Sequence, residues 1–179
     1  MEQPSSTERD PSAADPEDFH AFVASRGTPL YRTACLLTGG DTNQAEDLVQ
    51  ETLGRMYAKW GRRNGIENPA GYAQTILVNA FISSRRKSST ERAGLEASAA
   101  ADTAEHVDVP LRLTLLDALR RLPAQDRAVL VLRYWEDRSI DDTAAVMRLS
   151  STAVRSQSMR ALAKVRELLG ADFVEFVEN

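Results

Sequence analysis

Apolar residues recur every three to four positions along most of this chain, which is the spacing of one face of an α-helix. The clearest run lies within residues 41–60 and covers four turns. Its apolar face consists of Ala45, Leu48, Val49, Thr52, Leu53, Met56, Tyr57 and Trp60. No run alternates apolar and polar residues over a convincing length. The pattern therefore predicts an all-α fold.

Cap and turn residues divide the first half of the chain into four predicted helices, over about 16–26, 28–38, 41–60 and 69–87. Gly27 followed by Thr28-Pro29 predicts a break, because glycine and proline are poor residues for a helix interior. Asp41 and Gln44 have the spacing of a capping box. Asn68-Pro69 places a cap before a proline at the first helical position.

The second half predicts four more helices, beginning near residues 110, 124, 140 and 151. Ser139 and Asp142 form a capping box before the short third helix, and a tight turn at 148–150 leads to the longer fourth. A short helix, a tight turn and a longer helix make the helix-turn-helix pattern. Val154 is expected to pack the second of these helices onto the first.

The distribution of charge also separates the two predicted helical halves of the chain from the segments around them. The net charge is −4, but residues 19–92 and 111–170 each carry +4. The net negative charge lies in the remainder: residues 1–18, 93–110 and 171–179 carry −5, −4 and −3. We therefore expect an acidic disordered tail over 1–15, a helical domain over 16–92, a flexible acidic linker over 93–110, a helical domain over 111–170 and a short acidic tail over 171–179.

Several classes of function are disfavoured by the residues. There is no nucleophile with a base, no paired metal-binding carboxylates and no glycine-rich phosphate loop, so no catalytic residue, metal or cofactor is expected. Cys35 is the only cysteine. No apolar run approaches the roughly 20 residues that span a bilayer, and the first residues lack a signal-peptide core. We expect a cytoplasmic protein without membrane insertion.

Three polar helix faces are candidates for binding. The face of the last helix opposite its core carries Thr152, Arg155, Ser156, Met159, Arg160 and Arg166, and suits a DNA major groove. Helix 69–87 has a polar row that ends in Arg85-Arg86-Lys87, which can neutralise phosphates. The outer face of helix 41–60 is largely acidic, so it would bind a protein. Each could instead be a solvated helix surface.

Three segments of the chain resemble segments of a known protein family. The run AEDLVQETLGRMYAKW resembles the hallmark segment of sigma-70 factors of the extracytoplasmic-function (ECF) group, and NPAGYAQTILVNAFISSRRK resembles the −10 helix that follows it. Residues 122–166 are similar to the family's −35-reading domain, and the stretch from Val154 to Leu162 resembles the actinobacterial SigE-like branch. The three segments occur in the family's order.

This resemblance implies a role for each face. The clamp helices of the largest polymerase subunit would contact Asp47, Gln50, Glu51 and Arg55. The −10 element would contact Asn68, Tyr72, Asn79, Ser83, Arg85 and Arg86, with a flipped base held near loop 62–68. The −35 element would contact Ser151, Thr152, Arg155, Ser156 and Arg160. The polymerase flap tip would contact Leu119, Leu130 and Tyr134.

The resemblance also defines the partners and the alternatives. It implies core RNA polymerase and promoter DNA as partners, and an anti-sigma factor as a further one. A helix-turn-helix regulator that acts without polymerase is the main alternative, and a DNA-processing enzyme is the other. The acidic outer face of helix 41–60 distinguishes the first two, because a plain regulator has no use for it.

Overall fold

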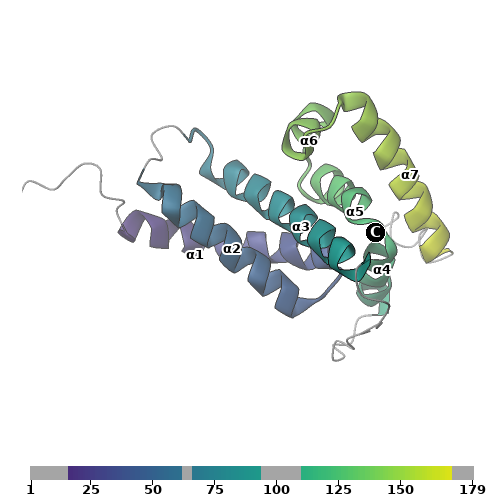
Figure 1. The fold of residues 1–179 in the computed structure, drawn as a ribbon, viewed down its shortest axis with the longest axis horizontal. Coiled ribbons are helices and arrows are strands. Elements are labelled where there is room, and N and C mark those ends of the chain that lie inside the picture. The colour runs from purple at the N-terminus through teal and green to yellow at the C-terminus, as the bar shows by residue number, and fades with distance from the viewer. Residues whose placement is uncertain (1–15, 62–65, 94–109, 171–179) are drawn as a thin grey trace, which may run out of the picture.

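The structure is a computed structural model, and it describes residues 16–61, 66–93 and 110–170 (Figure 1). Every regular element in these ranges is helical, which confirms the predicted all-α fold. The elements are α1 (Pro16–Thr38), α2 (Thr42–Trp60), α3 (Pro69–Ala93), α4 (Pro110–Arg121), α5 (Ala124–Leu130), η2 (Val131–Trp135), α6 (Ile140–Met147) and α7 (Ser151–Leu169). The predicted tails, nearly all of the predicted linker and residues 62–65 lie outside the described residues.

The predicted break at Gly27 is wrong. Helix α1 is continuous from Pro16 to Thr38 and contains Pro29 in its interior. An interior proline costs about 3 kcal/mol because it removes a backbone donor and crowds the preceding turn. Apolar residues on both sides of the proline pack against the same core, among them Phe22 and Leu30. Tertiary packing therefore overrides the local preference for a break.

The other predicted helix starts are confirmed where the chain is described. Asp41 Oδ1 accepts a hydrogen bond from Gln44 N at 2.9 Å and caps α2. Asn68 Oδ1 accepts from Gly71 N at 2.9 Å and caps α3. These bonds satisfy backbone donors that the first turn of a helix leaves without partners. Local sequence thus determines where both helices begin.

Helices α1, α2 and α3 pack together, and we call them the N-terminal module. Leu37, Met56, Leu77 and Phe81 are fully buried between them. Helices α4, α5, α6 and α7, with η2, form the C-terminal module, which matches the predicted four-helix domain with a helix-turn-helix. The predicted helix over 124–135 widens after Leu130 into the π-helical turn η2, where Glu136 N donates to Val131 O at 3.0 Å.

The two modules share one core, which the sequence did not predict. The larger apolar cluster contains Leu37 and Phe81 from the N-terminal module and Val129, Leu132 and Val154 from the C-terminal module. A second cluster lies between α4, α5 and α7, and Leu36 of α1 packs against it. In Figure 1, α5 and α6 accordingly lie beside α3.

The turn between α1 and α2 also contacts the C-terminal module. Gly39 and Gly40 have positive φ angles of 68° and 91°. A Cβ atom added to Gly39 would lie 2.7 Å from Arg120 Cβ of α4. Glycine at this position therefore permits both the left-handed backbone and the close approach of α4. Among the described residues, no helix is long and apolar enough to cross a membrane.

Candidate nucleic-acid and polymerase interfaces

The helix-turn-helix is built by two serine caps and a left-handed turn. Ser139 Oγ accepts from Asp142 N at 3.0 Å at the start of α6, and Ser150 Oγ accepts from Ala153 N at 3.1 Å at the start of α7. Arg148 has a φ angle of 55° and ends α6. Val154 is fully buried, in the same apolar cluster as Ala144 and Val146 of α6, which agrees with the prediction that it packs α7 onto α6.

The candidate −35 residues lie together on one side of α7. Thr152, Arg155, Ser156 and Arg160 are exposed, while Ser151 is half-buried and donates to Asp141 Oδ1 at 2.6 Å. Side chains three to four residues apart on a helix share a face, so this set forms one polar, basic surface. A surface of this kind near a helix N-terminus has the shape and charge to enter a major groove.

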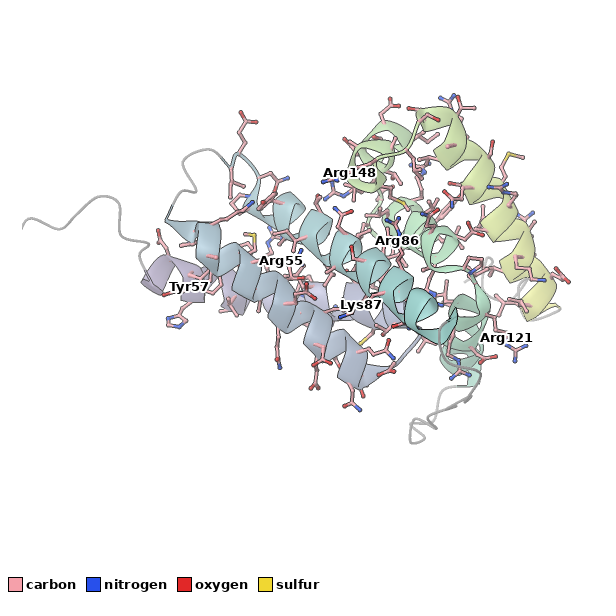
Figure 2. All side chains as sticks on the ribbon, viewed as in Figure 1. Arg55, Tyr57, Arg86, Lys87, Arg121 and Arg148 are labelled. Carbon is pink, nitrogen blue, oxygen red and sulfur yellow. The ribbon has the colours of Figure 1, made fainter. Side chains whose placement is uncertain are left out.

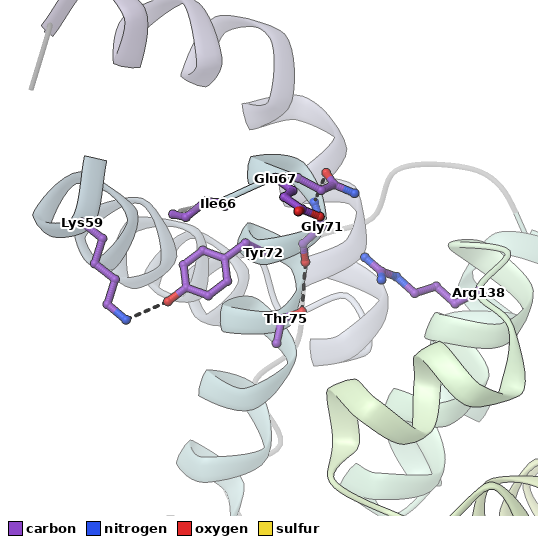
Figure 3. Close-up of a pocket in the computed structure, with 8 residues that line it drawn as sticks. Lys59, Ile66, Glu67, Gly71, Tyr72, Thr75 and Arg138 are labelled. Carbon is purple, nitrogen blue, oxygen red and sulfur yellow. Dashed lines mark hydrogen bonds between the residues drawn. The ribbon is translucent and has the colours of Figure 1, made fainter. Parts of the chain in front are cut away.

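A cleft of about 750 Å³ lies where α2 ends and α3 begins (Figure 3). Tyr72 and Thr75 of α3 line it, with the cap residue Asn68 and Lys59 of α2. Lys59 Nζ donates to the Tyr72 hydroxyl at 2.7 Å and lies 5.4 Å from the centre of the tyrosine ring. The cleft thus combines an aromatic wall with a cation, which are the features that bind an unstacked base and its phosphate. Residues 62–65 lie outside the described residues.

Arg138 also lines this cleft, although it belongs to the C-terminal module. Figure 3 shows its guanidinium reaching from the separate helical unit toward Gly71 and Thr75. Arg138 Nη2 lies 3.4 Å from the position of a Cβ atom built on Gly71. The wall of the cleft therefore depends on how the two modules are packed.

The remaining candidate −10 residues lie farther along α3. Asn79 is half-buried and Ser83 is exposed. Arg85 Nη2 donates to Gln44 Oε1 of α2 at 2.8 Å, so this arginine also connects two helices of the N-terminal module. Arg85 and Arg86 line a second cleft, of about 500 Å³, whose opposite wall is formed by α5 and Gln157 of α7.

The candidate polymerase-binding residues of α2 form an exposed face. Asp47, Gln50, Glu51 and Arg55 are all exposed, and Arg55 Nη2 pairs with Glu51 Oε1 at 2.6 Å. An exposed ion pair of this type contributes about 0–1 kcal/mol to stability, so folding alone does not require it. Figure 2 shows Arg55 and Tyr57 on α2 and Arg148 at the end of α6, on either side of α3.

The candidate flap-tip residues divide into two kinds. Leu119 and Leu130 are each 6% exposed and belong to the core between α4, α5 and α7. Tyr134 is 57% exposed, and the adjacent Trp135 is 56% exposed. Direct contact of the two leucines with polymerase stays a prediction. On the described surface, Tyr134 and Trp135 are the accessible apolar groups of this part of the chain.

Arg127 holds the two modules together at their centre. It is 4% exposed, and its guanidinium donates to the Leu37 carbonyl of α1 at 2.7 Å. It also donates to the carbonyls of Arg120 and Leu122, near the end of α4. Burial lowers the pKa of Arg127 to about 10, and repulsion from Arg85 and Arg120 adds to the effect, so the side chain stays charged at pH 7. Its charge is solvated by carbonyl groups at two helix C-termini, where cations are favoured.

A polar network connects α1 and α3 to the turn after η2. Thr33 Oγ1 donates to one oxygen of Glu136, and Gln74 Nε2 donates to the other. Arg138 Nη2 donates to Gln74 Oε1. We call Thr33, Gln74, Glu136 and Arg138 the interface network. Sequence reasoning missed it, as it missed Lys59, because no local pattern relates residues that meet only through tertiary packing.

Comparisons with known proteins agree with this geometry. Residues 22–91 match the family model for sigma-70 region 2, and residues 112–165 match the model for sigma-70 region 4. The RNA polymerase sigma-E factor of Streptomyces avermitilis is 33% identical over 85% of this chain and 85% of its own length. The ECF RNA polymerase sigma factor SigL of Mycobacterium tuberculosis is 31% identical over 89% of this chain and 94% of its own.

Solved structures give the same result. The sigma factor RpoE from Bartonella quintana, in complex with the anti-sigma factor NepR, is 29% identical, with a TM-score of 0.68 over 87% of this chain and 99% of that chain. CnrH, in complex with the cytosolic domain of CnrY, is 25% identical, with a TM-score of 0.58 over 90% of this chain and 94% of that chain. The two helical modules are therefore the two conserved regions of a sigma factor. The chain belongs to the sigma-70 family, in its ECF group.

Proposed function

We propose that this protein binds core RNA polymerase and directs it to promoters by contacting their −10 and −35 elements. The observation that carries the proposal is the presence of both sigma regions, in order, on one chain that matches ECF sigma factors over most of its length. The protein acts by recruitment and positioning in the cytoplasm, and it catalyses no reaction of its own.

The exposed face of α2 is the proposed contact with the clamp helices of the polymerase. Its acidic residues cannot attract DNA phosphates, so a protein surface that carries basic groups is the complementary partner. Asp47, Gln50, Glu51 and Arg55 would supply this contact. Tyr134 and Trp135 would add an apolar contact at the C-terminal module, where the resemblance predicts the flap tip.

The two DNA contacts would depend on different kinds of interaction. The basic face of α7 would read the −35 duplex from the major groove, where Arg155 can donate two hydrogen bonds to a guanine. The cleft at the start of α3 would hold an unstacked base against Tyr72, while Arg86 lies near the strand's phosphates. Together the two modules would place the −10 segment where its strands can separate.

The relatives also bear on the alternatives. A regulator that acts without polymerase would explain the helix-turn-helix, but it would not explain why residues 22–91 match sigma-70 region 2. Two of the similar structures are complexes with an anti-sigma factor or with the cytosolic domain of a partner protein. We propose that an anti-sigma factor of this kind is a further partner of this chain.

Co-elution with core polymerase in gel filtration tests the proposal. Asp47→Arg reverses one charge on the α2 face, and it is expected to abolish co-elution while leaving the helical circular dichroism unchanged. Glu167→Arg makes the same charge change at an exposed site on α7 and should co-elute like the unmodified protein. Equal co-elution of all three proteins would exclude α2 as the docking face.

A further inference from the structure

The second cleft, of about 500 Å³, lies between the two modules and carries an excess of positive charge. Arg85 and Arg86 of α3 line it from one side, and Arg127 of α5 lines it from the other. Figure 2 shows Arg86 on the side of α3 that is turned toward α5. Among the described residues of the lining, only Asp126 is acidic. Three cations therefore face one anion in a space of the size that holds a small ligand.

Arg127 is the buried member of this group, and its charge meets no carboxylate partner in the described part of the chain. It is 4% exposed, and its two terminal nitrogens donate to the carbonyls of Leu37, Arg120 and Leu122. Its Nε–H is buried and has no hydrogen-bond acceptor among the described residues. Because buried donors are almost always paired, this one indicates an acceptor that the described chain does not supply. An anion seated against Arg127 in the cleft would supply it.

Neighbouring cations make this buried charge less favourable. Burial lowers the pKa of Arg127, and repulsion from Arg85 and Arg120 lowers it further. Arg85 and Arg127 also lie against the same aromatic ring, each with its guanidinium carbon 5.7 Å from the centre of Phe81. An anion bound in the cleft beside these two side chains would add attraction where the chain itself provides repulsion.

The one carboxylate of the lining does not neutralise the arginines. Asp126 Oδ1 accepts a hydrogen bond from Gln157 Nε2 of α7 at 3.0 Å, and within the described residues it pairs with none of the three cations. The interface network differs in this respect, because its cation Arg138 and its anion Glu136 both bond to Gln74. The second cleft thus keeps a positive charge that the described chain leaves uncompensated.

A phosphate group matches this cleft in charge and in geometry. Three cations less one anion leave two positive charges, and a phosphate ester carries about −1.5 to −2 at pH 7. A guanidinium donates in a planar fork that fits two phosphate oxygens. Ile82 and Pro123 add apolar surface to the lining, against which the organic part of a phosphate ester can lie.

We propose that the second cleft is a binding site for a small phosphate-bearing molecule, held by Arg85 and Arg86 from α3 and by Arg127 from α5. The site differs from the proposed −10 contact, because a DNA strand there would use the α3 residues without Arg127. Since both modules supply its walls, the ligand binds the arrangement in which they are packed. The inference goes beyond the proposed function, and its tests need neither DNA nor polymerase.

Isothermal titration calorimetry with the full chain is the first test. The probes are sodium pyrophosphate and ADP, titrated separately without divalent cations and at an ionic strength fixed with NaCl. Saturable binding at one site per chain supports the proposal. Equal affinities would assign the recognition to the phosphates alone, and tighter binding of ADP would add contact with the apolar part of the lining. Absence of saturable binding for both probes would overturn the proposal.

A matched pair of charge removals locates the site. Arg86→Gln removes one cation of the cleft and should weaken binding of both probes about tenfold, which is the size of one charge-assisted hydrogen bond. Arg26→Gln makes the same change at an exposed position of α1 outside the lining, and it should bind like the unmodified protein. Equal weakening in the two variants would overturn the proposal, because the effect would then come from charge in general.

Asp126→Asn should change the affinity in the opposite direction, which a folding defect does not do. The amide keeps an oxygen that accepts from Gln157, and it removes the one negative charge of the lining. Both probes should bind about fivefold more tightly, because repulsion between the carboxylate and the phosphate is lost. Unchanged or weaker binding by this variant would show that the anion does not lie in the second cleft.

Discussion

The turn at Gly39 permits a direct test of how the two modules pack. Gly39→Ala adds one methyl group at a φ angle of 68°, and a left-handed backbone costs an alanine about 1–2 kcal/mol. The new Cβ atom would also lie 2.7 Å from Arg120 Cβ and 3.0 Å from Arg120 Cα. Because one of these atoms is backbone, α4 itself must move. Overpacking of this kind costs about 1–3 kcal/mol.

The expected total is therefore about 2–5 kcal/mol of lost stability. Gly40→Ala is the matched control, because Gly40 also has a positive φ, of 91°. The nearest atom to its added Cβ is Leu116 Cδ1, at 3.3 Å, which is the far end of a flexible side chain. The control should lose mainly the energy of backbone strain.

Thermal unfolding followed by circular dichroism measures the difference. In a chain of this size, about 1 kcal/mol corresponds to a shift of about 2–4 °C in Tm. Gly39→Ala should lower Tm by about 5–15 °C, and by clearly more than Gly40→Ala does. Equal losses in the two variants would mean that α4 does not approach the turn, and the packing of the two modules described above would be wrong.

Three further substitutions test separate parts of the structure. Gly54→Ala should raise the unfolding free energy by about 1 kcal/mol in a denaturant titration, since a Cβ atom there meets no atom within 4 Å; a loss would contradict the open α2 surface. Arg155→Ala should weaken binding of the complex with polymerase to the −35 duplex by roughly 1–3 kcal/mol in competition assays. Unchanged binding would mean that this face of α7 does not contact the DNA. Tyr72→Phe removes the hydroxyl that accepts a hydrogen bond from Lys59, and it should slow promoter opening about fivefold in permanganate footprints. An unchanged rate of opening would exclude Lys59 and Tyr72 from capture of the −10 strand.

Features that depend on neighbours in the sequence could be predicted. The caps at Asp41, Asn68 and Ser139 each use a donor three residues away, so a short motif contains all of the information. The helix-turn-helix is similarly local, because both helices and the turn between them lie within residues 140–169. The family resemblance added roles to these elements, and the family itself is confirmed by the comparisons.

Features that depend on packing could not be predicted. Gln74 and Glu136 are 62 residues apart in the chain, and nothing in either local sequence indicates that they meet. The continuity of α1 through Pro29 has the same origin, since the energy that compensates for the proline comes from α2 and the shared core. For Leu119 and Leu130, apolar character alone could not distinguish a core position from a docking surface.

Transcription of a pool of native upstream DNA fragments, with 5′ ends sequenced, tests the proposed function most directly. Core polymerase with this protein should produce transcripts whose start sites share one pair of upstream elements at a fixed spacing. Core polymerase alone, or with the Asp47→Arg variant, should not start at these sites. Identical start sites with and without the protein would contradict the assignment of promoter recognition to this chain.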